Sequence, residues 1–219
     1  MPPTQWKIAS HNASENGTTL LTTVIGEKRF PFPKSLYAVR DTLRFFVAEN
    51  PNALIVDFFA GSGTTLHAVN LLNAEDGGYR RCIMVTNNEV SDDEAKALRE
   101  NGYQPGDAEW EKLGIARYVT WPRTVCSIKG VDVNGNELSG NYGCEIEKMV
   151  EVEGEITDPN TGKKLRGTFF KKAKEAIYPT LSKIRMGDGF AANAKYFKLG
   201  FLDKSSVELG ASFKSIIPM

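Results

Sequence analysis

The segment Asp57-Phe-Phe-Ala-Gly-Ser-Gly-Thr-Thr65 combines residue types that are suited to holding a small ligand. Gly61 and Gly63 can adopt backbone angles closed to other residues, and without a Cβ they let a ligand approach the main chain. A helix that begins near Thr64 directs its free N–H groups and the positive end of its dipole into the same space. The pattern predicts a site for a nucleotide-like ligand, with a tight turn that binds nothing as the alternative.

Three common nucleotide or catalytic motifs fit this segment poorly. A P-loop requires a lysine after its last glycine, whereas Thr64 follows Gly63 here, which disfavours ATP or GTP. The dinucleotide fingerprint requires a third glycine where Leu66 stands, which weakens the case for NAD or FAD. The Gly-x-Ser-x-Gly nucleophile elbow also fails, because Ala60 and Thr64 occupy its outer glycine positions.

Glu89 is the second candidate for ligand binding. It follows the apolar run Cys82-Ile-Met-Val-Thr86, and an acid at the end of such a strand can accept hydrogen bonds from both hydroxyls of a ribose. A ribose without a bound pyrophosphate indicates an adenosyl cofactor. The alternative is that Glu89 only interacts with the dipole of the helix that follows.

These residues lead to a family resemblance. Asp57–Thr65 resembles the cofactor motif of S-adenosylmethionine-dependent DNA methyltransferases of the β class. In that class the motif order is permuted, and Phe32–Val39 resembles the preceding element, whose proline–lysine pair lies beside the methionine end of the cofactor. Gly17–Leu21, Val119–Arg123 and Tyr196–Leu199 resemble the modification subunits of type III restriction systems and their adenine-N6 relatives.

The resemblance implies a function and a set of cofactor contacts. It implies the S-adenosylmethionine-binding portion of a DNA methyltransferase that methylates adenine N6 in double-stranded DNA within a restriction-modification system. The residues expected to contact S-adenosylmethionine are Pro33, Lys34, Asp57, Phe58, Phe59, Ala60, Gly61, Ser62, Gly63, Thr64 and Glu89.

The sequence departs from this family in the motif that holds the target base. Such enzymes carry an Asp/Asn-Pro-Pro-Tyr/Phe tetrapeptide, and the nearest match here is Asp158-Pro-Asn160. In the permuted order the motif belongs upstream, so we assign no catalytic residue and expect a C-terminal portion that is inactive alone. Its partners would be the missing N-terminal portion or a partner subunit, with a homodimer also open. The alternatives are a non-catalytic partner subunit of a split or degenerate methyltransferase, or a methyltransferase for another substrate.

The elements around these motifs predict an α/β fold. We expect part of a doubly wound Rossmann-like sheet with helices on both faces, plus β-hairpin additions. Its predicted elements are a helix over 36–48 with Ser35 as N-cap, a strand over 53–57 buried on both faces, a helix from Thr64 to Gly77, a similarly buried strand over 82–86, and a helix from the Ser91–Glu94 capping box to Asn101-Gly102.

The flanking segments give weaker signals, and four regions are expected. Residues 1–29 are a linker or a remnant of an upstream region, 30–130 the cofactor-binding core, 131–190 a hairpin and helical insertion, and 191–219 a late strand and tail. Within them we predict a strand over 117–121 followed by a short helix ending at Gly130, hairpin turns at Asn134-Gly135 and 158–162, a weak helix over 171–186 interrupted by Pro179, and a strand over 196–202.

Composition limits the other classes of function. The chain has 41% hydrophobic residues, no apolar run long enough to span a membrane and no secretory signal, so we expect a cytoplasmic protein. Its 27 basic and 27 acidic residues argue against strong DNA binding by the isolated chain. The basic stretch from Lys163 to Arg185 is either a DNA contact or a solvated face. Three cysteines without a CxxC pair and two histidines predict reduced thiols and no metal site.

Overall fold

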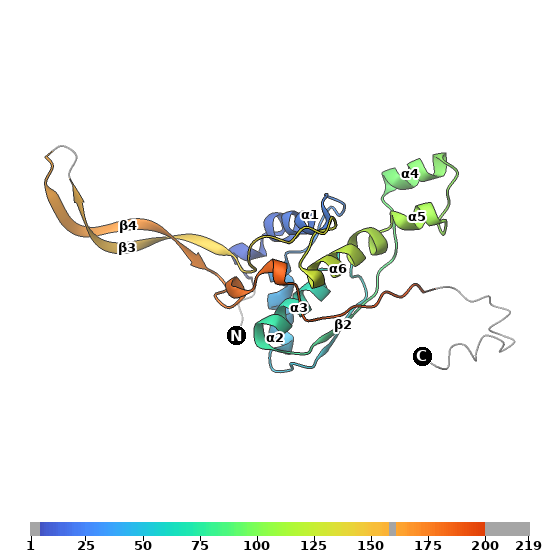
Figure 1. Cartoon of the computed structure of the whole chain (residues 1–219), viewed down its shortest axis with the longest axis horizontal. Coiled ribbons are helices and arrows are strands. Elements are labelled where there is room, and N and C mark those ends of the chain that lie inside the picture. The colour runs from blue at the N-terminus through green and yellow to red at the C-terminus, as the bar shows by residue number, and fades with distance from the viewer. Residues whose placement is uncertain (1–4, 158–160, 200–219) are drawn as a thin grey trace.

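The computed structural model describes residues 5–157 and 161–199. Within these ranges a mixed α/β body carries a long two-stranded ribbon that projects away from it (Figure 1). The elements in chain order are η1 (Ala9–His11), η2 (Ser14–Thr19), α1 (Leu20–Ile25), α2 (Leu36–Val47), β1 (Leu54–Asp57), α3 (Thr64–Asp76), β2 (Arg81–Met84), α4 (Asp92–Glu100), α5 (Ala108–Lys112), η3 (Ala116–Thr120), α6 (Trp121–Lys129), β3 (Glu145–Thr157), β4 (Lys164–Ala176), η4 (Leu181–Lys183) and η5 (Met186–Asp188).

The unit β1–α3–β2 positions the glycine turn. β1 and β2 pair in parallel from Leu54↔Arg81 to Asp57↔Met84, and α3 connects them. The predicted order of strand, helix, strand and helix is therefore confirmed for β1, α3, β2 and α4. The doubly wound sheet is not confirmed, because each sheet among the described residues has two strands.

The prediction that both strands are buried on both faces is wrong. Leu54, Val56 and Ile83 are 50%, 45% and 50% exposed, respectively. These residues alternate with more buried neighbours, because successive side chains of a strand point to opposite faces. One face of the β1–β2 pair is therefore open to solvent in the described part of the chain.

The boundaries of the main helices follow from local chemistry. The prediction of Ser35 as N-cap of α2 is confirmed, because its Oγ accepts a hydrogen bond from Ala38 N at 3.3 Å. Helix α3 ends at Gly77, which takes a left-handed conformation with φ of 73°. Pro122 stands in the first turn of α6, where a missing N–H costs nothing, and Gly130 ends that helix as predicted.

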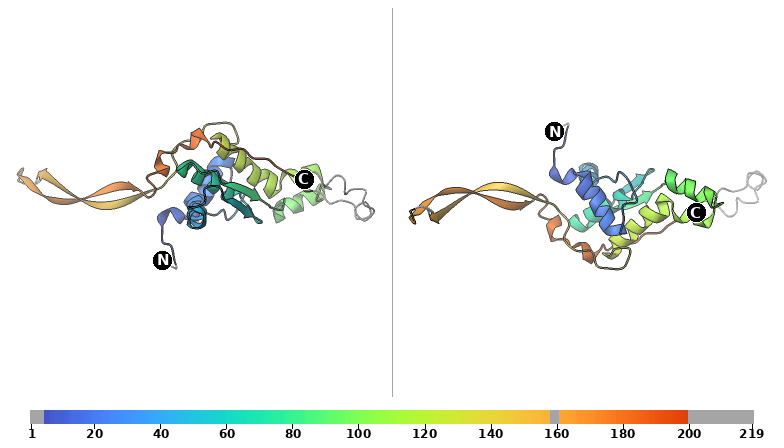
Figure 2. Two further views of the ribbon diagram at one scale, coloured as in Figure 1. Left: turned by 90° about the horizontal axis from the view of Figure 1, so that it is seen from below. Right: turned by 90° about the horizontal axis from the view of Figure 1, so that it is seen from above.

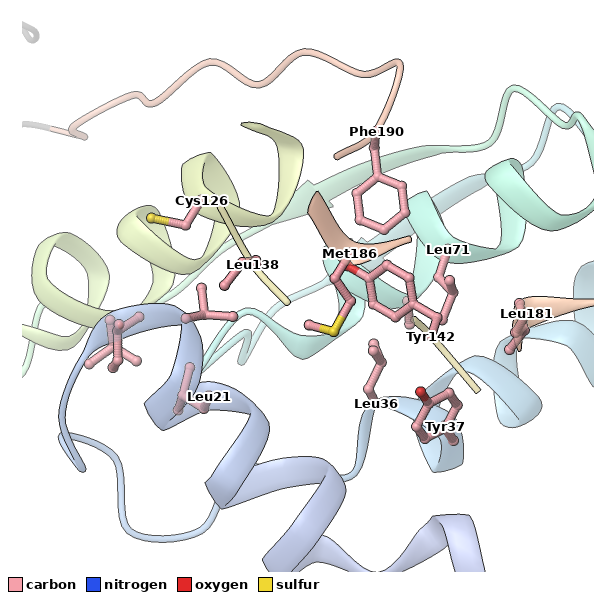
Figure 3. Packing of buried hydrophobic residues seen from close by; sticks show 14 residues of the cluster. Leu21, Leu36, Tyr37, Leu71, Cys126, Leu138, Tyr142, Leu181, Met186 and Phe190 are labelled. Carbon is pink, nitrogen blue, oxygen red and sulfur yellow. The ribbon is translucent and has the colours of Figure 1, made fainter. Parts of the chain in front are cut away.

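One hydrophobic core joins segments from both ends of the described chain. Figure 3 shows Leu21 of α1 and Leu36 of α2 facing the same cluster as Leu71 of α3, Tyr142 and Phe190. Leu36 and Leu71 are fully buried, and the rings of Tyr142 and Phe190 stack with centroids 5.5 Å apart. The remaining buried members of the cluster are Val24, Ile25, Tyr37, Ala68, Val119, Cys126, Leu138, Leu181 and Met186.

Two segments have a different conformation from the predicted one. Residues 14–25, within the region expected to be a linker or a remnant of an upstream region, form η2 and α1, and Leu21, Val24 and Ile25 of α1 are buried. The strand expected at 117–121 is wrong, because η3 and the start of α6 occupy these residues. The first segment is rich in β-branched residues, and the second also holds two aromatic residues. Both types have weak helix propensity, and burial of one helix face overrides that preference.

The ribbon consists of β3 and β4, which pair antiparallel from Glu145↔Ala176 to Thr157↔Lys164. Three views show it extending from the body, opposite to α4 and α5 (Figures 1 and 2). Thirteen residues per strand correspond to a length of about 43 Å. The weak helix predicted over 171–186 is wrong, since β4 continues to Ala176 and only η4 and η5 follow.

Three other predictions fall near this region. Around Asn134-Gly135 the chain doubles back with a single antiparallel bridge, Val131↔Glu137. The turn predicted at 158–162 lies partly outside the described residues. Of the strand predicted over 196–202, residues 196–199 form no strand, and 200–202 lie outside the described residues. Among the described residues, no helix has both the length and the apolarity needed to cross a membrane.

Candidate cofactor site

The glycine turn lies between the end of β1 and the start of α3. Gly61 and Gly63 have φ values of 50° and 74°, in the left-handed region that favours glycine. A Cβ on Gly63 would also lie 3.2 Å from Thr120 Cγ2. Ala60 N donates to Val85 O at 3.1 Å, which fixes the turn to the chain just beyond β2. The sequence therefore reaches this sharp bend only because glycine occupies both positions.

Asp57 holds the two ends of the turn together. Its Oδ1 accepts a hydrogen bond from Phe59 N at 3.0 Å, and its Oδ2 accepts one from Thr65 Oγ1 at 2.5 Å. These contacts link the last residue of β1 to the first turn of α3. A carboxylate at this place also interacts favourably with the positive end of the helix dipole. The immediate role of Asp57 in the structure is thus to shape the turn.

A cavity of about 280 Å³ opens beside the turn. Seven of the residues predicted from the sequence line it, namely Lys34, Asp57, Phe59, Ala60, Gly61, Ser62 and Thr64. The structure therefore brings the proline–lysine element and the glycine turn to one place, although 23 positions separate Lys34 from Asp57. The Lys34 side chain is exposed at this cavity and supplies a cation there.

Four predicted residues do not line the cavity. Pro33 is fully buried, and Gly63 faces Thr120 rather than the cavity. Phe58 is 67% exposed. Glu89 is exposed beyond the end of β2, where its Oε1 accepts a hydrogen bond from Asn87 Nδ2 at 3.2 Å.

Five lining residues were not predicted as ligand contacts: Phe30, Pro31, Phe32, Val39 and Thr65. The sequence signal for the first three is the Phe30-Pro-Phe-Pro33 run, because alternating prolines enforce an extended segment whose aromatic side chains cannot pack into a helix. Phe32 and Phe59 are 82% and 93% exposed, so two aromatic rings stand at the cavity with most of their surface uncovered. Flat apolar groups of this kind are suited to stacking on a ligand base.

The end of η3 and the first part of α6 support the turn from the other side. Thr120 Oγ1 donates to Gly61 O at 2.5 Å, and Arg123 Nη1 donates to Thr64 Oγ1 at 2.7 Å and to Ser62 Oγ at 3.3 Å. The Arg123 side chain is completely buried. The sequence indicates residues 119–123 through their resemblance to a family motif. It does not predict that they support the glycine turn, because a strand is expected over 117–121.

His67 of α3 completes the polar layer beneath the turn. Burial, together with the charge of Arg123, lowers the pKa of His67 far below its ordinary value, so the imidazole is neutral. His67 Nδ1 accepts from Arg123 Nε at 3.4 Å, which leaves the Nε2 proton to donate to Tyr142 Oη at 2.8 Å. Burial lowers the pKa of Arg123 to about 10, which still leaves it protonated at neutral pH.

The geometry is thus a ligand-sized cavity at the carboxyl edge of two parallel strands, with a glycine turn, a helix N-terminus and exposed aromatic rings. A family model described as "DNA methylase", for N6 and N4 methylases, matches residues 3–150 and includes every residue that lines the cavity. The chain belongs to the N6/N4 DNA methylase family.

Individual relatives match shorter stretches. The type II methyltransferase M.KpnI of Klebsiella pneumoniae is 43% identical over 75 residues, which are 34% of this chain and 18% of that protein. The Mod subunit of the type III restriction-modification enzyme EcoPI, from Escherichia phage P1, is 36% identical over 89 residues, which are 41% of this chain and 13% of that protein. The Mod subunit of StyLTI, from Salmonella typhimurium, is 36% identical over 74 residues, which are 34% of this chain and 11% of that protein. The matched stretch is a small part of each relative.

The basic stretch from Lys163 to Arg185 lies largely on the ribbon, and four of its cations pair with acids. Lys172 Nζ lies 3.0 Å from Glu147 Oε2, and Lys174 Nζ lies 3.4 Å from Glu145 Oε2. Lys164 and Arg185 pair with Glu155 and Glu137 in the same way. These exposed pairs favour the interpretation as a solvated face over a DNA contact.

Proposed function

We propose that this chain is the S-adenosylmethionine-binding portion of a DNA methyltransferase that methylates adenine N6 in a restriction-modification system. Membership of the N6/N4 DNA methylase family supports this proposal, as do relatives named as type II and type III modification enzymes. The observation that carries it is the cavity beside the glycine turn. Ligands of open α/β folds bind at this carboxyl edge of the strands.

The residues at the cavity fit an adenosyl amino-acid cofactor. Its volume, about 280 Å³, is near the lower end for small-molecule sites, and its open side leaves part of a ligand uncovered. Phe32 and Phe59 offer rings for an adenine, and Lys34 offers a cation for a carboxylate. We further propose that Pro33, Phe58, Gly63 and Glu89 support or extend this site, with Glu89 directed to the ribose.

In the proposed methyl transfer, this chain would bind the cofactor and orient it. S-adenosylmethionine, when bound, supplies an electrophilic methyl group for direct displacement by an amino nitrogen. The turn from Asp57 to Thr64 would hold the cofactor beside the start of α3, whose N–H groups are already fixed in place by the helix. Catalysis of this kind rests on positioning and involves no covalent enzyme intermediate.

The base pocket belongs to another polypeptide segment in this proposal. The chain has no Asp-Pro-Pro-Tyr tetrapeptide and no net charge, so alone it neither holds a flipped adenine nor grips a DNA backbone strongly. A missing N-terminal portion or a partner subunit would supply both, and double-stranded DNA would bind to the complete enzyme. We therefore expect this chain to be inactive on its own.

A second candidate is a non-catalytic partner subunit that serves a complete methyltransferase. The exposed apolar residues Leu54, Val56 and Ile83 favour it, because such a face is suited to binding a second polypeptide. Extending the reading frame upstream distinguishes the two candidates. Adenine methylation by the extended chain supports the first, and methylation only after addition of a separate, complete methyltransferase supports the second.

The direct test is calorimetric titration of the folded chain with S-adenosylmethionine, using two matched valine substitutions. Gly63 and Gly77 stand at opposite ends of α3 with φ values of 74° and 73°. Both substitutions impose similar backbone strain, but only Gly63→Val crowds the turn, since nothing lies within 4 Å of a Cβ on Gly77. We expect Gly63→Val to abolish binding and Gly77→Val to retain it. Absence of binding by the folded wild-type chain, and by the chain with its upstream region restored, would refute the proposal.

A further inference from the structure

Arg123 differs from the other deeply buried arginines of this chain. Arg40 is paired with Asp41 and Glu75, and Arg80 is paired with Asp76. Arg123 has no acidic partner among residues 5–157 and 161–199, and its Nη2 has no hydrogen-bond partner there. Buried charges in proteins are normally paired, because removing an ion from water is costly. A buried cation in this state is suited to a negatively charged ligand that binds close to it.

The contacts of Arg123 place its guanidinium next to the cavity. Its Nη1 contacts Thr64 Oγ1 at 2.7 Å and Ser62 Oγ at 3.3 Å, and both residues line the cavity. The guanidinium is therefore separated from the cavity by one layer of small polar side chains. The other neighbour, His67, contributes no opposing charge, since its Nδ1 accepts a hydrogen bond from Arg123 Nε.

We propose that Arg123 is a specificity-determining residue, whose buried guanidinium makes this wall of the cavity select a ligand that bears a carboxylate. This inference rests on the proposed function, in which the carboxylate is that of the amino-acid end of S-adenosylmethionine. Because the intervening region is shielded from water, the attraction acts through a lower effective dielectric than at the surface. Lys34 provides a second, exposed cation at the same cavity, so the two contributions must be measured separately.

A pair of ligands that differ only in the carboxylate makes this separation possible. S-adenosylmethionine and its decarboxylated form, S-adenosylmethioninamine, are titrated calorimetrically into the wild-type chain and into Lys34→Met. Lys34 is exposed, so this substitution leaves the folded core intact. We expect Lys34→Met to keep a preference of about tenfold for the ligand with the carboxylate, which corresponds to one charge–charge interaction in a partly shielded site.

Substitution of Arg123 itself gives the complementary measurement. Arg123→Met removes the charge and keeps the apolar length, whereas Arg123→Lys keeps the charge. Ser127→Ala is the matched control, because it alters another buried residue of α6 without removing a charge. We expect Arg123→Met to weaken the binding of S-adenosylmethionine about tenfold and the binding of the decarboxylated ligand less than twofold. Arg123→Lys should keep most of the wild-type preference for the ligand with the carboxylate.

The outcomes separate this inference from the proposed function. Equal weakening of both ligands by Arg123→Met would assign Arg123 a structural role only. If that variant does not fold, Lys34→Met still tests the inference. Loss of the whole preference for the ligand with the carboxylate in Lys34→Met would overturn the proposed role of Arg123. Binding of both ligands with equal affinity refutes the inference about Arg123 but is consistent with the proposed cofactor site. Binding of neither ligand by the folded chain, with or without its upstream region, refutes both.

Discussion

Asp76→Asn is a sharp test of how the body of this fold is held together. The guanidinium of Arg80 is completely buried, and it donates to both oxygens of Asp76 at 2.9 Å. The same group donates to Val47 O at the end of α2, at 2.9 Å. Arg80 therefore links the last turn of α2, the last turn of α3 and the start of β2. Loss of the Asp76 charge leaves a buried cation with carbonyl partners and one amide oxygen.

The expected loss of stability in Asp76→Asn follows from the exposure of Arg80 and Asp76. A hydrogen bond to a charged group contributes about 1.5–3 kcal/mol, and the Asp76 side chain is 41% exposed, so solvent screening reduces this value. We expect Asp76→Asn to lower the free energy of unfolding by about 1.5 kcal/mol at pH 7. For a chain of this size that corresponds to a fall in Tm of roughly 3–6 °C.

The effect depends on pH in a defined direction. Partial burial raises the pKa of Asp76, but hydrogen bonds from Arg80 and Gly78 and the charge of Arg80 outweigh it, so the pKa lies below its ordinary value. A carboxylate with a lowered folded-state pKa contributes stability above its unfolded pKa, which is about 3.9, and loses it as the pH falls through the folded value. The difference between wild type and Asp76→Asn is therefore full at neutral pH and shrinks below about pH 4.

Urea denaturation followed by circular dichroism at pH 7 and pH 3 measures both quantities. Glu49→Gln is the matched control, because it removes one negative charge from an exposed residue just beyond α2, and we expect a change within about 0.5 kcal/mol. Equal midpoints for Asp76→Asn and Glu49→Gln at pH 7 would refute the reasoning. A difference that persists undiminished well below pH 3 would show that it does not come from ionisation of Asp76.

Three further predictions concern the turn, α2 and the ribbon. Thr120→Val removes the hydroxyl that donates to Gly61 O, and we expect about fivefold weaker cofactor binding by calorimetry, with a smaller loss for Thr124→Val in α6. Ser35→Ala removes the N-cap of α2, and we expect a loss of about 1 kcal/mol in urea denaturation; an unchanged midpoint contradicts this. Replacing residues 145–176 with a short Gly-Ser turn should leave Tm nearly unchanged, because Ile177 N already donates to Cys144 O at 2.7 Å, whereas a fall of 10 °C would place the ribbon within the folding unit.

The site elements were predictable because their signals are local. Ser35 caps α2 through its own side chain, and Gly61, Gly63 and Gly77 mark bends that other residues do not adopt easily. A short apolar run followed by a glycine turn then indicates β1 and α3 without reference to the rest of the chain. The family resemblance added the list of expected ligand contacts, and seven of these residues, Lys34 among them, line one cavity.

The features that the sequence did not predict depend on residues that lie far apart in the chain. Arg123 is a polar residue whose role is set by α3, and nothing near it in the chain indicates burial beneath Ser62 and Thr64. The same applies to α1, whose threonines suggest a loop until Leu21 and Val24 meet the core. Exposure of one face of β1 and β2 was also missed, because a continuous apolar run does not reveal whether both faces are covered.

The composition of the core also determines when this chain can complete its folding during synthesis. Leu21 and Val24 lie in the same cluster as Leu181, Met186 and Phe190, which the ribosome adds some 160 residues later. At about 5–20 residues per second, that interval lasts on the order of 10–30 s. During it the core around α1 lacks its last members, although α6 and the other earlier elements are already available to pack on it. A termination codon just before Phe190 would remove the last 30 residues and, with them, the ring that stacks on Tyr142 in the core.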